Sequence, residues 1–400
     1  MKNLKKGILA KKLLALFLVA SVSVCANVPA VAIKPGPILS ARHSSPTVKN
    51  KDQQINGTCW AFAVIAALET YLKKYGLYTG SLSEQQMANL CSHNPSDYGW
   101  NNLKHNGNFV AALACLTAGL SPISERDCPY NYNNIGFRRN LLNIQPLFFV
   151  DGIENVNKDI DSIKAAVAEY GAVAAIFIVN DTINHAVSIV GWDDSKQSWL
   201  VKDSLKNPNN YVWIPYSTQF IEVVCITDVR AFDDNLKRYQ HDEYGVTGFY
   251  RDKNFAVANM FDFEGNEELE SVMVNSSSPD APISLHLAPV LGDGSPNSDR
   301  STWQHLYSGC VPYDGYFTFS LQNKVQLNRG KYAIIAQMEQ AADSSVPRIG
   351  CMMPHENLTL GPNTPGKSFI LSGNKFCDVT SLSNCNSIYG FSIKAITRQS

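Results

Sequence analysis

The feature that most constrains this chain is a cysteine placed where a helix is predicted to begin. Gly57 and Thr58 form a turn, and from Cys59 to Leu72 apolar residues recur at helical spacing until Gly76 ends the pattern. A thiol at a helix N-terminus lies near a partial positive charge, which favours the thiolate form. Because the thiolate is the nucleophile, Cys59 is a candidate catalytic residue. The alternative is a small buried cysteine that only packs.

A histidine on a predicted strand could serve such a nucleophile. The apolar run 172–179 predicts a buried strand, and the segment 184–192, Asn-His-Ala-Val-Ser-Ile-Val-Gly-Trp, follows almost at once. His185 in this segment could take the thiol proton. A lone histidine in an apolar strand is more often a core residue, so a catalytic role for His185 depends on the other residues of the pattern.

Together these stretches resemble the active-site segments of papain-like cysteine peptidases. In that family the nucleophile opens a helix and is followed by Trp or Tyr, here Cys59-Trp60, and a glutamine six positions earlier, here Gln53, donates to the oxyanion. His185 stands in the family's His-Ala-Val pattern, and Asp203 stands where the family has an asparagine that orients the histidine. The resemblance implies Gln53, Cys59, His185 and Asp203 as catalytic residues. The Cys-to-His and Cys-to-Asp separations are near the ~130–150 residues typical of the class.

A second resemblance begins at Ser83. Ser83 with Gln86 forms a capping box that predicts a helix start, and Leu-Ser-Glu-Gln ahead of a cysteine, here Cys91, recurs in papain-like enzymes. The family also has a disulfide near its nucleophile, and this chain has Asn56 and Trp100 at the two positions. A further departure is Leu205, which replaces the family's tryptophan beside the orienting residue.

Two residues are predicted to bind substrate. Gly107 is chosen as the edge that hydrogen-bonds an extended substrate backbone, although a plain turn glycine is about equally consistent with the sequence. Ala186 is expected beside a substrate pocket, which the resemblance makes open because the connection before His185 is short.

The sequence predicts two domains. Residues 51–235 are expected to form an α+β, two-lobed papain-like domain, with Cys59 on a helical half and His185 and Asp203 on a β-rich half. A polar linker is predicted at 236–254. From 255 to 400, short apolar runs alternate with turn signals, which predicts an all-β sandwich. This half resembles the lectin-like module of some bacterial papain-like peptidases. It is expected to be a separate module that either shields its neighbour or binds a glycan or surface protein.

The first 50 residues predict export. Residues 1–26 read as a signal peptide, with a lysine-rich start and an apolar run, and 27–50 as a short extended segment. The predicted location is therefore secreted, extracellular or periplasmic. Apart from Cys25 and Cys59, eight cysteines remain, and in an exported chain they suggest disulfides of open connectivity. The resemblance is consistent with a Cys91–Cys128 bridge.

The net charge of the chain limits the classes of partner that the sequence supports. A net charge of −1 gives no electrostatic argument for nucleic acid or an anionic membrane. No cysteine or histidine spacing predicts a metal, and no cofactor is expected. The prediction is a monomeric secreted cysteine endopeptidase acting on peptides or proteins. Two alternatives stay open: a transglutaminase-like acyl transferase, and a catalytically silent protein whose sandwich binds a surface.

Overall fold

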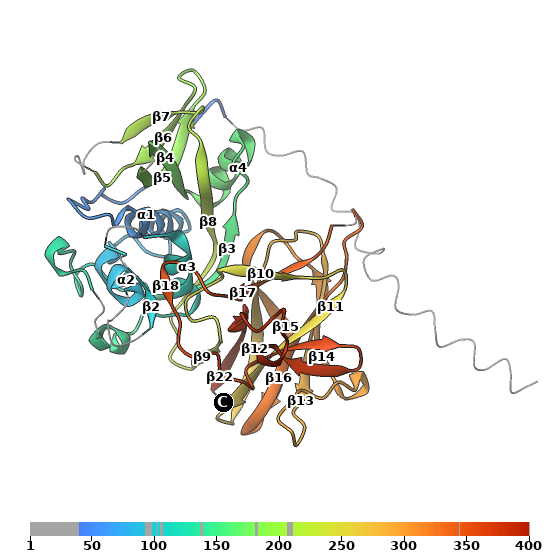
Figure 1. Ribbon diagram of the computed structural model, residues 1–400. Coiled ribbons are helices and arrows are strands. Elements are labelled where there is room, and N and C mark those ends of the chain that lie inside the picture. Colours follow the sequence, from blue (N-terminus) through green and yellow to red (C-terminus); the bar gives the residue numbers. More distant parts are fainter. Residues whose placement is uncertain are drawn as a thin grey trace, which may run out of the picture. The chain divides into compact units, whose positions relative to one another are not determined.

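The computed structural model describes residues 40–92, 98–101, 103–104, 107–136, 139–180, 183–205, 211–343 and 345–399 (Figure 1). The predicted signal peptide and residues 27–39 lie outside this set. Among the described residues, none of the helices has the length and apolar character needed to cross a membrane.

Among the described residues the first domain has four α-helices, and three of them begin at a side-chain cap. They are α1 (Cys59–Lys74), α2 (Glu84–Cys91), α3 (Phe109–Thr117) and α4 (Ile160–Tyr170). The Ser83 hydroxyl accepts a hydrogen bond from the Gln86 backbone N–H at 3.0 Å, as the capping box predicts. Asn108 and Asp159 cap α3 and α4 in the same way. Two short 3-10 helices follow, η1 (Tyr132–Asn134) and η2 (Arg139–Asn143).

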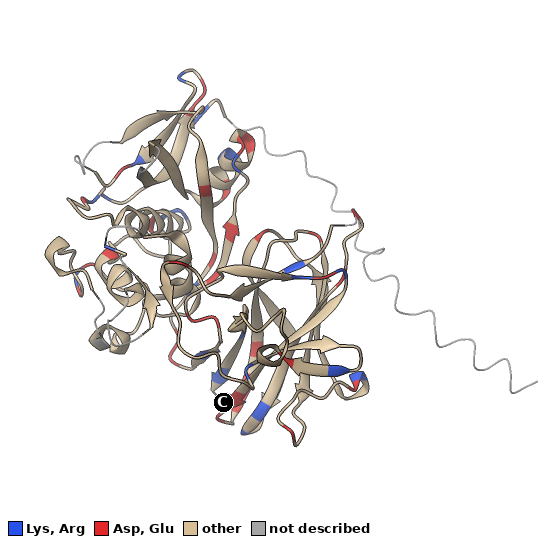
Figure 2. Ribbon diagram, viewed as in Figure 1, with Lys and Arg blue, Asp and Glu red and all other residues tan. Residues whose placement is uncertain are grey.

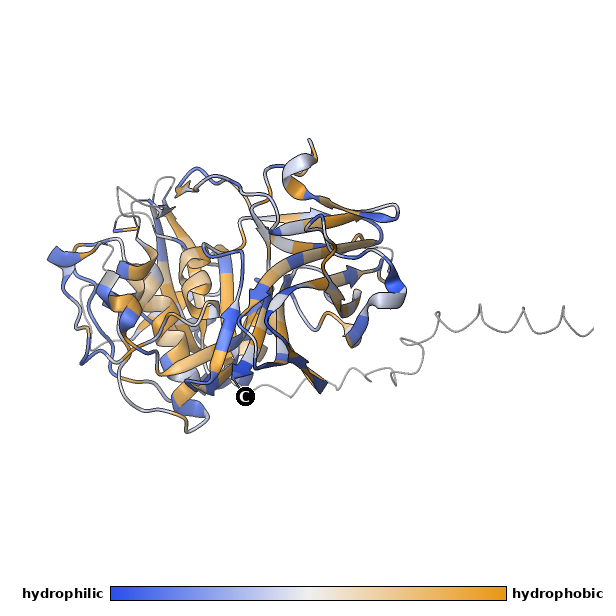
Figure 3. Cartoon of the chain, turned by 90° about the horizontal axis from the view of Figure 1, so that it is seen from below, coloured by the Kyte–Doolittle hydropathy of each residue, from blue (hydrophilic) through white to orange (hydrophobic). Residues whose placement is uncertain are grey.

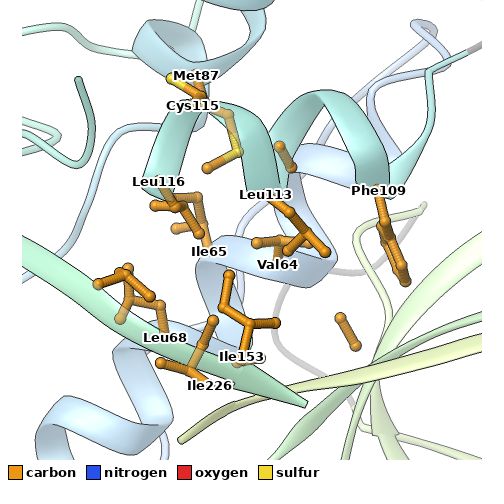
Figure 4. Packing of buried hydrophobic residues seen from close by; sticks show 14 of the residues in the cluster. Val64, Ile65, Leu68, Met87, Phe109, Leu113, Cys115, Leu116, Ile153 and Ile226 are labelled. Atoms are coloured by element: carbon orange, nitrogen blue, oxygen red, sulfur yellow. The ribbon is translucent and has the colours of Figure 1, made fainter. Parts of the chain in front are cut away.

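The core of the first domain is organised around α1. Its residues Trp60 to Leu72 are all buried, because the helix is covered by α3 on one side and by strands on the other. Figure 4 shows apolar side chains of α1 meeting those of α3 and of two strands; the labelled members are Val64, Ile65, Leu68, Met87, Phe109, Leu113, Cys115, Leu116, Ile153 and Ile226. Burial of this cluster fixes the helix that begins at Cys59.

An antiparallel sheet carries the other half of the first domain. Its order is β3-β8-β4-β5-β6-β7, and β1 pairs with β5. The bounds are β1 (Arg42–Ser44), β3 (Phe148–Asn155), β4 (Val173–Asn180), β5 (Ile183–Asp193), β6 (Ser198–Lys202), β7 (Val212–Pro215) and β8 (Phe220–Ala231). The predicted buried strand at 172–179 is thus β4, and the strand carrying His185 is β5.

The second half of the chain is all β, with two sheets enclosing an apolar core. One sheet has the order β14-β13-β16-β11-β19-β20, and the other contains β10, β17, β12, β15, β21, β22 and β9. Along several strands apolar and polar residues alternate, as Figure 3 shows. The bounds are β9 (Leu236–Tyr239), β10 (Gly248–Arg251), β11 (Phe255–Phe263), β12 (Glu267–Ser276), β13 (Pro282–Pro289), η3 (Arg300–Thr302), β14 (Gln304–Cys310), β15 (Gly315–Leu327), β16 (Gly330–Met338), β17 (Arg348–Met352), β19 (Ser368–Ser372), β20 (Lys375–Asp378), η4 (Val379–Ser381), β21 (Gly390–Phe391) and β22 (Ile393–Gln399).

The two halves share one sheet, which differs from the separate module expected from the sequence. Gly315 and Tyr316 of β15 pair with Glu154 and Ile153 of β3, so one 14-stranded sheet runs through both. The expected linker at 236–254 instead contributes β9, which pairs with β22, and β10, which pairs with β17. Local composition did not indicate these strands because their partners are far away in the chain.

A third contact joins the halves through a two-stranded sheet. Its strands are β2 (Gly99–Trp100) and β18 (Leu358–Thr359).

Lys and Arg are interspersed with Asp and Glu over both halves of the ribbon, in agreement with the net charge of −1 (Figure 2).

Candidate active site

Three of the predicted catalytic side chains meet between α1 and the sheet. Cys59 is the first residue of α1, His185 lies on β5, and Asp203 directly follows β6. The His185 Nε2 atom is 2.8 Å from Asp203 Oδ1, and the same imidazole interacts with the Cys59 thiol. One histidine therefore contacts both a thiol and a carboxylate, which is the arrangement needed to activate a cysteine nucleophile.

The environment of His185 favours its charged form. Burial by itself lowers the pKa of His185, but the hydrogen bonds with Asp203 and Cys59 outweigh burial and raise the pKa to about 9. At neutral pH the imidazole is then protonated. A protonated imidazole beside Cys59 stabilises the thiolate through opposite charge.

Several contacts hold Asp203 in place. Its Oδ1 accepts a hydrogen bond from the Leu205 backbone N–H at 2.9 Å, and its backbone carbonyl accepts one from Asn50 Nδ2 at 2.6 Å. The Phe177 ring meets His185 edge-on, with centroids 5.8 Å apart. Leu205 is 37% exposed, and the Asp203 side chain remains 22% exposed. Water therefore reaches the carboxylate, which weakens its field at His185.

Gln53 is buried next to this group and is fixed by two hydrogen bonds. Its Nε2 donates to the Asn56 carbonyl at 2.6 Å, and its Oε1 accepts from the Ser204 hydroxyl at 2.6 Å. An amide Nε2 carries two hydrogens, and one of them is used in the bond to Asn56. Tyr130 secures the same loop, since its hydroxyl donates to the Gln53 carbonyl at 3.0 Å and lies 2.7 Å from the Thr58 hydroxyl.

Sequence reasoning missed a cluster of buried charges behind α1. Lys51 Nζ lies 2.5 Å from Glu84 and 3.4 Å from Glu69, with Glu125 at 3.7 Å, and Lys202 lies 3.9 Å from Glu69. Burial lowers the pKa of Lys51, but the three carboxylates together raise it above its usual range. The one available signal was Glu69, a carboxylate inside an otherwise apolar stretch of α1.

The structure gives the surroundings of the two predicted substrate-binding residues, whose roles stay predictions. A Cβ atom on Gly107 would come within 1.8 Å of Trp60 Nε1, so close packing against this indole requires glycine there. Ala186 is 2% exposed and faces a small internal cavity shared with Phe62 and Glu69. Because side chains alternate along a strand, Ala186 and His185 point to opposite faces of β5. The place of Ala186 beside a substrate pocket stays a prediction.

The suggested bridge between Cys91 and Cys128 is not formed in the structure. Seven of the described cysteines are free thiols: Cys59, Cys91, Cys115, Cys225, Cys351, Cys377 and Cys385. The Cys91 thiol donates to the Ala111 carbonyl at 3.2 Å and contacts Cys115; this contact and burial raise its pKa. Cys128 packs instead with Ile123 and Leu141 in a separate small cluster, so the Cys91–Cys128 bridge is replaced by a contact between α2 and α3.

Two family models match the chain, one to each half. Residues 39–210 match the papain family cysteine protease model, and residues 238–397 match a lectin-like domain. The predicted resemblance and the predicted fold class are confirmed: a papain-like cysteine peptidase domain is followed by a β-rich lectin-like domain.

Individual relatives agree with this division. The chain is 26% identical over 189 residues to a probable cysteine protease, RDL2, of Arabidopsis thaliana, which covers 41% of this chain and 49% of that protein. It is 29% identical over 183 residues to cysteine proteinase COT44 of Brassica napus, covering 38% of this chain and 51% of that protein. The chain spans about half the length of the curated relatives it matches.

One solved protein is similar over both halves. The cysteine protease and lectin-like domains of Cwp84, a surface layer associated protein of Clostridium difficile, match with a TM-score of 0.82 at 28% identity, covering 90% of this chain and 89% of that one. A clostridial Cwp84 structure after propeptide cleavage gives a TM-score of 0.81 at 28% identity, covering 88% and 97%. These similarities support a cysteine peptidase.

Proposed function

We propose that this chain is a cysteine endopeptidase that hydrolyses peptide bonds with Cys59 as its nucleophile. The observation that carries the proposal is the position of His185, which is hydrogen-bonded to Asp203 at 2.8 Å and also interacts with the Cys59 thiol. In isolation each of these residues has an ordinary structural explanation. Their meeting at the N-terminus of a buried helix does not.

Each group has a defined role in the proposed reaction. The Cys59 thiolate attacks the carbonyl carbon of the substrate, and the His185 imidazolium then gives its proton to the leaving amine. Water, deprotonated by the neutral imidazole, next attacks the thioester, and the thiol is released. The second Nε2 hydrogen of Gln53 and the backbone N–H of Cys59 stabilise the oxyanion in this proposal. Asp203 keeps the imidazole oriented.

Export of the chain is part of this proposal. The lysine-rich and apolar pattern of residues 1–26 supports it, and the similar protein Cwp84 is described as surface layer associated. The substrates would then be peptides or proteins outside the cytoplasm. The purified chain should accordingly digest a mixed peptide library.

Covalent labelling tests the nucleophile directly. A peptide carrying an epoxide or vinyl sulfone should modify Cys59, as located by mass spectrometry, and Cys59→Ala should remove both labelling and hydrolysis. Cys377, a partly exposed thiol of the lectin-like domain, supplies the matched control, since Cys377→Ala should change neither. His185→Ala should also abolish hydrolysis, and the double variant should be no worse than either single one. Full hydrolysis by Cys59→Ala, or incorporation of amines into glutamine donors in place of hydrolysis, would reject the proposal.

A further inference from the structure

The lectin-like domain reaches the helical half of the peptidase domain through a small contact, here called the clasp (residues 99–101 and 355–359). Leu358 lies opposite Trp100 and Thr359 opposite Gly99 in the β2–β18 pair. Next to this pair the Asn101 backbone N–H donates to the Asn357 carbonyl at 2.8 Å. The clasp therefore joins two segments more than half the chain apart by backbone hydrogen bonds.

Side chains add to the clasp. Asn101 Nδ2 donates to the Thr359 hydroxyl at 3.1 Å, and this hydroxyl can donate to Asn101 Oδ1 at 3.3 Å. Trp100 is 2% exposed; its Nε1 donates to the Tyr244 carbonyl at 3.0 Å, and its ring meets His355 with centroids 5.2 Å apart. The peptidase side of the clasp is thus held by two separate segments that follow the peptidase domain in sequence.

The residues that follow the clasp bond to both sides of the nucleophile. The Leu103 carbonyl accepts a hydrogen bond from Trp60 Nε1 at 3.1 Å. The Lys104 carbonyl accepts one from the Gly57 backbone N–H at 2.7 Å. Gly57 lies two residues before Cys59 and Trp60 one residue after it. A displacement of this short segment would therefore be transmitted to the start of α1.

We propose that the clasp makes the lectin-like domain a positioning element for Cys59. This inference rests on the proposed function and adds that the active site is completed by residues of the second domain. The hydroxyl of Thr359 and the amide of Asn101 are positioning groups, because they act on Cys59 through residues 103 and 104. Small displacements of a nucleophile reduce the rate strongly, since catalysis depends on reacting atoms being held in alignment.

The test uses the full-length chain with substitutions that remove only the side-chain part of the clasp. Thr359→Val keeps the shape and removes the hydroxyl, Thr359→Ser restores a hydroxyl, and Asn101→Ala removes the partner. Thr302 supplies the matched control: its hydroxyl donates to the Asp299 carbonyl at 2.7 Å, and it lies two residues before β14, which belongs to the six-stranded sheet and not to the β2–β18 pair. The measurements are kcat and KM on one peptide, the rate of Cys59 alkylation by iodoacetamide, and the thermal midpoint.

Thr359→Val and Asn101→Ala should each lower kcat by roughly three- to tenfold with little change in KM, the equivalent of one lost hydrogen bond. Both should slow the alkylation of Cys59, and the double variant should be no worse than either single one. Thr359→Ser and Thr302→Val should behave like the unmodified chain. A purely structural contact would lower the thermal midpoint and leave kcat and alkylation of the folded protein unchanged.

Two outcomes would overturn the inference: wild-type kcat and alkylation rates in both clasp variants, or an equal loss in Thr302→Val. Failure of the proposed function can be told apart from these. In that case the unmodified chain hydrolyses no peptide, yet the alkylation rate of Cys59 still reports whether the clasp variants disturb it. If one variant does not fold, the other removes the same hydrogen bonds from the opposite side.

Discussion

The interior behind α1 and the interior of the sandwich are built on different principles. Behind α1 the peptidase domain places Lys51 and Lys202 among three carboxylates, and Lys202 directly precedes Asp203 in the chain. Between the two sheets of the lectin-like domain the core is apolar. The lectin-like half also contains a buried ion pair, Lys394 of β22 with Asp242 at 2.8 Å, and Asp242 lies in the segment that connects the two domains. Charge is thus buried close to the reacting groups and at the junction, while apolar area holds the second domain.

The largest effect is expected when the two regions are separated from each other. Deletion of residues 240–400 should yield an insoluble or unfolded fragment without peptidase activity. It removes the partners of β3, β9 and Trp100, and buried backbone groups left without partners are costly. Solubility, circular dichroism and hydrolysis of a short peptide are the measurements. A soluble, fully active fragment would show that the regions are independent, as the sequence suggested.

A smaller effect distinguishes buried from exposed charge. Lys51→Met leaves Glu84 buried without its cation and Glu69 with only Lys202 at 3.9 Å, which should cost about 3–5 kcal/mol of the free energy of unfolding. Lys324 of the lectin-like domain also contacts two carboxylates but is 46% exposed, so Lys324→Met should lower the free energy of unfolding far less. Urea titration of both variants measures the difference. Equal costs would mean that the cluster behind α1 is no more demanding than a surface ion pair.

The next prediction concerns the charge beside His185. Hydrolysis requires protonated His185, so the rate should fall on the alkaline side near the pKa of His185, which is about 9. Asp203→Asn keeps a hydrogen-bond acceptor and removes the negative charge, and the pKa of His185 therefore decreases. The alkaline limb of kcat/KM should move to lower pH while a measurable rate remains. A limb that stays or moves upward would show that another residue orients His185.

The smallest effect should come from covering Asp203. Leu205→Trp places a larger apolar side chain over a carboxylate that is now 22% exposed. Less water at Asp203 strengthens its attraction to the imidazolium, so the alkaline limb should move upward. The shift should be smaller than that of Asp203→Asn and opposite in sign. The same pH series, recorded with Leu205→Ala as the uncovered control, measures it.

Local signals were sufficient for the elements that carry the site. The start of α1 at Cys59 followed from a turn before an apolar helical pattern, and the capping box at Ser83 predicted α2. The apolar run 172–179 predicted the neighbouring strand β4, and the resemblance to papain-like peptidases implied the strand of His185. These features depend on neighbours in sequence, so the local sequence is enough to predict them. Apolar runs and turn signals predicted in the same way that the second half of the chain is all β.

Features that depend on distant partners could not be obtained in this way. Lys51 and Glu84 look like surface residues in the sequence, and only the packing of α1 and α2 makes them a buried pair. The partner of Cys91 proved to be Cys115, because helix packing and not cysteine spacing decides which thiols meet. The pairing of β2 with β18 joins residues 100 and 358, and a two-residue strand has no pattern to recognise.

The order in which a ribosome makes this chain gives the shared sheet a further consequence. Cys59, His185 and Asp203 all emerge before β15, β18 and β22 exist, although β3, β2 and β9 pair with those later strands. A nascent chain therefore has its reactive side chains long before it has the backbone partners of β2, β3 and β9. Its peptidase domain is completed only by residues from 315 onward, so synthesis itself delays the assembly of the finished site.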